Sequence, residues 1–373
     1  MPNCYALKKE KLLAALRLQR TKSVGPILAK KLIRATGDVE QIFREKTKNL
    51  AKIEGINLKI LEHLCDSELE TLALQELEYL EKNAIEALYF LDSDYPKNLS
   101  HCIDGPILFF KEGKINFNSQ RIISIVGTRQ MTSYGRRLCT EFVDGLAEYD
   151  PTIVSGFAYG VDICAHTSAI ENKLQTIAVL AHGFEQIYPK VHKKYVNQVK
   201  ENGGFITEFW HQEDPKREHF IQRNRIVAGI SQATLVIESS EKGGSLITAD
   251  LANSYNRDVF AIPGRTSDLF SSGCNELIKN HKAALVTSPA DIAKLLNWDQ
   301  PLKTTPAIQK QLFVSLEPLE QKVYDYLLNE GKQLLDVIAI ECDLRLPLLA
   351  SLLFQLEMKG LVQPLPGKLF EAV

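Results

Sequence analysis

Phosphate-binding chemistry is concentrated in one segment of this sequence, from Phe220 to Asp250. The segment reads FIQRNRIVAGISQATLVIESSEKGGSLITAD, so a charged RNR cluster precedes an apolar strand, and a Gly-Gly-Ser turn then opens a helix. This order brings arginine side chains and free backbone N–H groups to the same end of one sheet. We therefore expect an anion to bind there: a nucleotide, a phosphosugar or the backbone of a nucleic acid.

Glycine, hydroxyl and basic residues also follow the other expected strands. Gly127, after the strand IISIV, permits a sharp turn, and Arg129 provides a planar fork that suits phosphate. Ligands of open parallel sheets bind outside the carboxyl ends of the strands, so these groups should converge. The candidate binding residues are Gly127, Thr128, Arg129, Ser155, Gly156, Lys194, Arg217, Phe220, Arg223, Asn224, Arg225, Lys242, Gly243, Gly244 and Ser245.

The stretch WHQEDPKREHFIQRNR interleaves cations with aromatic rings. Such a mixture suits single-stranded nucleic acid, because cations follow the phosphates and an exposed ring such as Phe220 stacks on a base for about 1–3 kcal/mol. Duplex grooves are read by a helix or a ribbon, and the stretch offers nothing comparable. The two arginines of the RNR cluster have a second interpretation, as internal ion-pair partners of Glu208 or Glu238.

No catalytic motif is recognisable in the sequence. A P-loop lysine motif, a GxSxG elbow, an HExxH pair and a kinase signature are all missing. Asp162 and His166 lie four residues apart on one expected helix, which could suggest a metal or acid–base pair, but a structural role is the commoner one. The seven cysteines are scattered without a CxxC pair, which indicates reduced thiols and no zinc site. We expect no catalytic activity, no metal and no cofactor.

The overall composition excludes two classes of protein. A net charge of −2 and a pI of about 6.5 exclude a protein coated in basic residues, so a nucleic acid would have to bind at a local patch. No stretch approaches the ~20 apolar residues of a membrane span, and charges interrupt the apolar run at the N-terminus, unlike a signal peptide. Together with the reduced thiols, these features predict a cytoplasmic protein without membrane contact.

The hydrophobic pattern divides the chain into three domains and a linker. Residues 1–82 show only helical periodicity, whereas residues 83–298 alternate short apolar strands with helices. The strands lack polar–apolar alternation, so helices should cover both faces of a doubly wound, Rossmann-like α/β sheet. Residues 299–314 combine prolines with little periodicity and are predicted to be a linker. Residues 315–373 contain three helices and a two-stranded hairpin, the pattern of a winged helix.

The two flanking domains carry weaker functional signals. The motif KSVGPILAKKLI, with Gly25 in a turn and Pro26 at a helix start, predicts a helix-hairpin-helix. Such a hairpin can present N–H groups to a phosphate, but its poor basic rim favours a packing role. In the winged helix, the third helix PLLASLLFQLEMKG is nearly all apolar, whereas a helix that reads the major groove needs polar or basic residues. This domain is predicted to contact protein and not duplex DNA.

Taken in this order, the motifs resemble the DprA/Smf family of bacterial DNA-processing proteins. The resemblance implies an extended Rossmann-like domain between a SAM-like helical domain and a DML1-like winged helix. It also implies single-stranded DNA binding without base preference in natural transformation, protection of incoming strands, loading of the RecA recombinase, and a homodimer formed through the Rossmann domain. The matching pieces are LDSDYPKNL, GPILFFKEG, IVGTRQMTSYG, SGFAYGVDICAH, TIAVLAHGFEQIYP, HFIQRNRIVAGIS, KGGSLITADLA, VFAIPG and GCNELI, which run from residue 91 to about 290.

By motif match, the resemblance implies roles for individual residues. Arg129 and Arg217 would hold phosphates and Phe220 would stack on a base, while Lys242 and the Gly243–Ser245 turn would line the same groove. The sequence departs from the expected family pattern at three positions, where arginine, glycine and serine would be expected: Tyr159, Ala181 and Gly243.

A nucleotide or phosphoribosyl hydrolase is the alternative function, because Rossmann relatives with a Gly-Gly-rich turn after a strand perform such hydrolysis. Asp250 could then stand at the position of the catalytic acid. Leu246 and Ile247 occupy the place of a second glycine pair, which speaks against this alternative.

Overall fold

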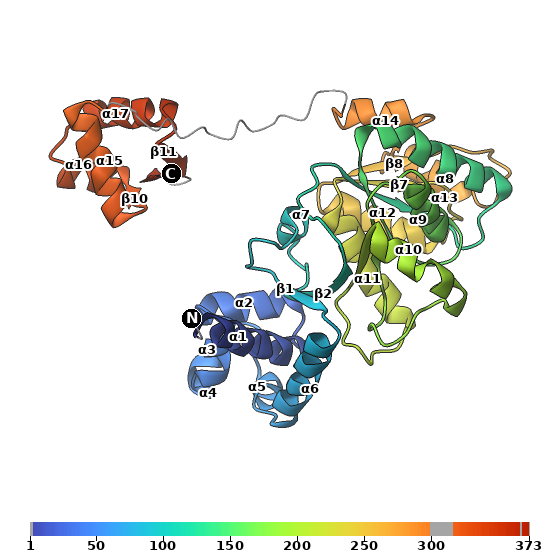
Figure 1. The fold of residues 1–373 in the computed structure, drawn as a ribbon, viewed down its shortest axis with the longest axis horizontal. Coiled ribbons are helices and arrows are strands. Elements are labelled where there is room, and N and C mark those ends of the chain that lie inside the picture. The colour runs from blue at the N-terminus through green and yellow to red at the C-terminus, as the bar shows by residue number, and fades with distance from the viewer. Residues whose placement is uncertain (1–2, 299–315, 366–367, 373) are drawn as a thin grey trace. The chain divides into compact units, whose positions relative to one another are not determined.

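The computed structural model describes residues 3–298, 316–365 and 368–372 (Figure 1). The chain forms two compact units, residues 1–300 and residues 301–373, and each is described by itself. The helical segment and the sheet predicted as separate domains both belong to the first unit. The predicted linker lies outside the described residues.

Six helices precede the sheet, as the periodicity predicts. Gly25 caps α2 and Pro26 is its first residue, in agreement with the expected hairpin. Leu32 and Ile33 are buried, whereas Ile27, expected in the same apolar stripe, is 53% exposed. The helices are α1 (Asn3–Arg20), α2 (Pro26–Thr36), α3 (Val39–Arg44), α4 (Thr47–Leu50), α5 (Leu58–Leu64) and α6 (Glu68–Lys82).

A nine-stranded sheet forms the centre of the first unit, in the order β1-β2-β6-β5-β4-β3-β7-β8-β9. The seven strands from β6 to β9 in this order are parallel, and β1 and β2 add an antiparallel edge. Successive strands run outward from β3 in both directions, so the switch point lies between β3 and β7. The strands are β1 (Glu86–Tyr89), β2 (Leu108–Gly113), β3 (Ile122–Val126), β4 (Thr152–Ser155), β5 (Thr176–Val179), β6 (Gly203–Thr207), β7 (Ala233–Val236), β8 (Asp258–Ala261) and β9 (Ala284–Leu285).

Helices cover both faces of the sheet, which confirms the doubly wound α/β class (Figure 1). In β3, Ile123 and Ile125 pack against α8, α9 and α14, whereas Ile122 and Val126 pack on the side of α11, α12 and α13. The helices are α7 (Lys97–Ser100), α8 (Ser133–Leu146), α9 (Val161–Glu171), α10 (Val196–Glu201), α11 (Arg217–Ile230), α12 (Gly244–Ser254), α13 (Ser272–Lys279) and α14 (Pro289–Leu295), with 3-10 turns η1 (Ala147–Tyr149) and η2 (Lys190–Tyr195).

Polar contacts join the six N-terminal helices to the sheet. Gln19 of α1 uses both ends of its amide: Nε2 donates to the carbonyls of Leu108 (2.9 Å) and Glu208 (3.1 Å), and Oε1 accepts from the Trp210 indole (3.0 Å). Leu108 and Trp210 also belong to the apolar core of the helical segment. The helices therefore complete the core beside the antiparallel edge of the sheet.

The second unit is a winged helix, as predicted. Its sheet has the order β10-β12-β11, and the sequence indicated the hairpin but not β10, a strand of only two residues. No helix among the described residues of either unit is long and apolar enough to cross a membrane. The elements are α15 (Pro318–Glu330), β10 (Gln333–Leu334), α16 (Leu335–Glu341), α17 (Leu346–Met358), β11 (Val362–Leu365) and β12 (Leu369–Ala372).

An apolar stripe on α17 agrees with the prediction that this unit does not read duplex DNA. Leu346, Phe354 and Met358 recur at multiples of four residues and are exposed. Residues 315–373 also carry nine acidic and five basic side chains. We expect the isolated segment 315–373 to show no measurable affinity for a DNA duplex in an anisotropy titration, and tight, salt-sensitive binding would contradict this prediction.

Candidate nucleic-acid interface

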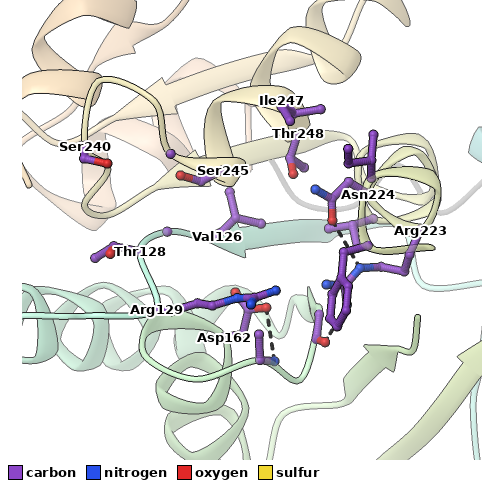
Figure 2. A pocket seen from close by; sticks show the side chains of 18 of the residues that line it. Val126, Thr128, Arg129, Asp162, Arg223, Asn224, Ser240, Ser245, Ile247 and Thr248 are labelled. Carbon is purple, nitrogen blue, oxygen red and sulfur yellow. Dashed lines mark hydrogen bonds between the residues drawn. The ribbon is translucent and has the colours of Figure 1, made fainter. Parts of the chain in front are cut away.

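A cavity of about 720 Å³ opens at the carboxyl ends of the strands, at the switch point between β3 and β7 (Figure 2). Its walls come from the loops after β3, β4 and β7 and from helices α11 and α12. The structure brings twelve of the fifteen candidate residues to this cavity: Gly127, Thr128, Arg129, Gly156, Arg217, Phe220, Arg223, Asn224, Lys242, Gly243, Gly244 and Ser245.

The loop after β3 is held in place by Glu238, at the end of β7. The Glu238 carbonyl accepts from the N–H of Thr128 (2.8 Å), and its carboxylate accepts from the N–H (2.9 Å) and the hydroxyl (2.5 Å) of Thr132. Gly127 is required in this loop, because a Cβ there would overlap Val161 of α9. The fixed loop directs Arg129 into the cavity (Figure 2).

Three cations on the cavity wall are available to a ligand. Arg129, Arg217 and Lys242 are exposed, and none of them forms an ion pair with another described residue. The first residues of α12, beginning at Gly244, add N–H groups at a helix N-terminus, where the dipole also favours an anion. Asp162 is the one carboxylate among the described residues that line the cavity, so the cavity has a positive net charge.

Phe220 lies beside these cations. The guanidinium carbon of Arg129 is 4.8 Å from the centre of the Phe220 ring, and the Tyr188 ring meets Phe220 edge-on at 5.8 Å between ring centres. A base that stacks on the face now covered by Arg129 would have to displace that guanidinium or share the face with it.

Arg223 forms the floor of the cavity. Its Nη1 donates to the carbonyls of Gly156 and Val179, at the ends of β4 and β5. A Cβ at residue 156 would overlap the guanidinium, which explains the glycine. Burial lowers the pKa of Arg223 to about 10, partly offset by the Asp162 carboxylate, so the side chain remains charged at neutral pH. Arg223 is internal, as the second interpretation proposed, but its hydrogen bonds go to backbone carbonyls and to the Asn224 side chain, and not to Glu208 or Glu238.

The structure places the other three candidates away from the cavity lining. Arg225 is buried, where it forms an ion pair with Glu208 and donates to the Asp104 carbonyl, so the second interpretation applies to it. The Ser155 hydroxyl is buried and donates to the Ile125 carbonyl at 2.6 Å. Lys194 lies on η2, with its ammonium 4.9 Å from the centre of the Tyr195 ring.

Asp162 and His166 make the contacts of structural residues. The Asp162 carboxylate accepts from the Ala158 N–H at 3.3 Å, and burial raises its pKa although the Arg223 charge acts in the opposite direction. His166 Nδ1 is 2.7 Å from the hydroxyl of Thr176, which itself donates to a backbone carbonyl, so the imidazole Nδ1–H is the donor. The described residues contain no group of three side chains that could hold a metal.

Replacement of His166 should change how stability depends on pH. Burial and the nearby Arg223 charge lower the pKa of His166 to about 3, from about 6.5 in an unfolded chain. The unfolded state therefore binds the additional proton between these values, and stability falls as the pH drops below 6.5. From pH 7 to about pH 5, the free energy of unfolding of the native chain should fall by ~2 kcal/mol more than that of His166→Gln. Urea titrations at both pH values measure the difference, and equal falls would contradict the assignment.

Sequence reasoning missed several apolar and hydroxyl residues of the wall. Ile221 and Val227 of α11 and Ile247 and Thr248 of α12 also line the cavity. The sequence does contain a pattern that groups the α11 residues of the wall: at helical spacing, residues 217, 220, 221, 224 and 227 fall on one face of α11. Recognising it would have required knowing that this face meets α12.

Comparisons with known proteins agree with this architecture. The family model of DNA recombination-mediator protein A matches residues 86–297, and that of the DprA winged helix domain matches residues 309–368. The chain belongs to the DprA/Smf family. Protein Smf of Synechocystis sp. is 30% identical over 94% of this chain and 96% of its own length.

Two solved DprA structures are also similar. DprA of Streptococcus pneumoniae superposes with a TM-score of 0.62 at 30% identity, covering 78% of this chain and 96% of that one. DprA of Helicobacter pylori, described for its single-stranded DNA binding mode, superposes with a TM-score of 0.53 at 27% identity, covering 58% of this chain and 97% of that one.

Proposed function

We propose that this chain binds single-stranded DNA in the cavity at the switch point of its sheet. The observation that carries the proposal is the convergence of Arg129, Arg217 and Lys242, none of them ion-paired with a described residue, around the partly exposed ring of Phe220. Cations beside an aromatic face suit a strand whose phosphates and unpaired bases are both accessible. The DprA of H. pylori, whose described property is single-stranded DNA binding, supports the proposal.

Replacing Arg129 by alanine tests the phosphate role. Loss of one phosphate contact should weaken binding to all single-stranded sequences about equally and lower the slope of log K against log salt by about 0.7. The measurement is an anisotropy titration of an oligonucleotide at several salt concentrations. Arg137→Ala is the matched control, because Arg137 is an exposed arginine of α8 that does not line the cavity. An unchanged slope for Arg129→Ala, or a loss confined to one base composition, contradicts the role.

We further propose that the bound strand is protected and passed to the RecA recombinase in natural transformation, and that the protein acts as a homodimer formed through the sheet domain. Membership of the recombination-mediator family supports these proposals. The protein should accelerate RecA assembly on DNA covered by a single-strand-binding protein, measured as ATP hydrolysis by RecA. Absence of acceleration would contradict the loading role, and a monomeric mass in light scattering would contradict the dimer.

Hydrolysis of a nucleotide or phosphoribosyl substrate is the alternative, and the position of Asp250 argues against it. Asp250 does not line the cavity, and its carboxylate accepts from Lys282 Nζ at 2.9 Å. Release of free base from nucleoside monophosphates incubated with the protein would favour the alternative.

A further inference from the structure

The amide of Asn224 is held in one orientation on the wall of the cavity. Arg223 cannot turn, because its Nη1 is bound to two backbone carbonyls beneath the cavity. Its Nε–H donates to Asn224 Oδ1 at 3.1 Å. An N–H donor must meet the oxygen and not the nitrogen of an amide, so this contact determines which end of the Asn224 side chain faces Arg223.

The other end of the amide therefore faces the cavity. Figure 2 shows the Asn224 nitrogen on the side of the amide away from Arg223, toward Thr248 of α12, which also lines the cavity. Nδ2 makes no hydrogen bond within the described part of the chain, so both of its N–H donors are available to a ligand. This donor pair is partly shielded from solvent, since Asn224 is only partly exposed.

The surroundings of this donor pair suit the edge of a nucleobase. Phe220 lies one turn earlier on the same face of α11, about 6 Å along the helix axis. Ile221 and Ile247 are exposed and line the cavity from the two helices beside Asn224. A planar ring that packs against these apolar groups lies in the same cavity as Nδ2, where a polar group on its edge can accept from that donor pair.

We propose that Asn224 is a specificity-determining residue that binds the exocyclic carbonyl oxygen of a base. Uracil, thymine and guanine carry such an oxygen on the edge opposite the sugar, whereas cytosine and adenine carry an amino group there. An amino group is itself a donor, so it would form no hydrogen bond with the Nδ2 donors. The inference rests on the proposed single-stranded DNA binding and refines it, because it replaces binding without base preference by a preference for keto bases.

Homopolymers of deoxyuridine and deoxycytidine of equal length provide the test, because the two bases have the same ring size and differ only at N3 and at the exocyclic group. Binding of each to the full chain is measured by fluorescence anisotropy at fixed salt and mildly alkaline pH. The native chain should bind the uridine polymer about fivefold more tightly, the value of one hydrogen bond. Asn224→Asp keeps an oxygen toward Arg223 and presents an acceptor to the cavity, so the preference should invert. Asn224→Ala should abolish it.

Gln130→Glu is the control for added charge, because Gln130 also lines the cavity wall. This variant should weaken binding of both polymers alike and leave their ratio unchanged. Equal affinities in the native chain, or a uridine preference that survives in both Asn224 variants, would overturn the inference while single-stranded DNA binding stands. Failure of both polymers to bind the native chain would instead refute the proposed function.

Discussion

Arg225→Met should lower the free energy of unfolding by about 3–5 kcal/mol, the usual cost of leaving one member of a buried ion pair without its partner. The Glu208 carboxylate is 5% exposed, and burial raises its pKa even in the presence of the Arg225 guanidinium. Without Arg225, that carboxylate must take up a proton or remain charged in the interior. A urea titration measures the change.

The double variant Glu208→Leu/Arg225→Met is the control, because it removes both charges and should recover much of the lost stability. The single variant should also bind single-stranded DNA with native affinity per folded molecule, because Arg225 does not line the cavity. A fall in affinity with stability unchanged would restore the role in DNA binding that the sequence predicted for this residue.

Phe220→Ala should weaken single-stranded DNA binding by about 1–3 kcal/mol, because the variant removes an aromatic face on which a base can stack. The salt dependence should hardly change, since the ring contacts no phosphate. These two effects distinguish the role of the ring from that of Arg129, whose guanidinium carbon lies 4.8 Å from the ring centre. Removal of Arg129 should instead flatten the salt dependence of binding. Anisotropy titrations at several salt concentrations measure both quantities.

Two further substitutions distinguish stacking from simple apolar contact. Phe220→Tyr keeps the aromatic face and should bind nearly as tightly as the native chain, whereas Phe220→Leu keeps apolar bulk without the face and should lose most of the same affinity. Equal affinity of the leucine and native proteins would show that no base stacks on residue 220.

The class of the fold could be predicted because the short apolar runs between residues 122 and 286 have no polar–apolar alternation, which indicates strands covered on both faces. The antiparallel pairing of β1 with β2 was not predictable in the same way. Those strands belong to the stretch around LDSDYPKNL and GPILFFKEG, where the pattern indicated only short extended pieces. The place of this pair at the edge of the sheet is set by the pairing of β2 with β6, which lies more than ninety residues further along the chain.

For residues that lie just after a strand, such as Gly127 and Arg129, the sequence was sufficient to predict a position at the cavity. The topology of the sheet alone brings such positions together. Within the RNR cluster the sequence could not distinguish one arginine from the other. Arg223 and Arg225 are two residues apart and so point about 200° apart around the helix, which places Arg223 at the floor of the cavity while Arg225 turns toward Glu208 in the interior. The phase of α11 relative to the sheet decides this, and it depends on tertiary packing.

Gln19 has a consequence for any shortened form of the chain. A protein that began after residue 82 would leave the carbonyls of Leu108 and Glu208 and the indole of Trp210 without their shared amide partner, next to an uncovered apolar edge. Such a truncation would lose solubility before it lost any DNA-binding residue. The six leading helices therefore contribute to the core of the same compact unit as the sheet.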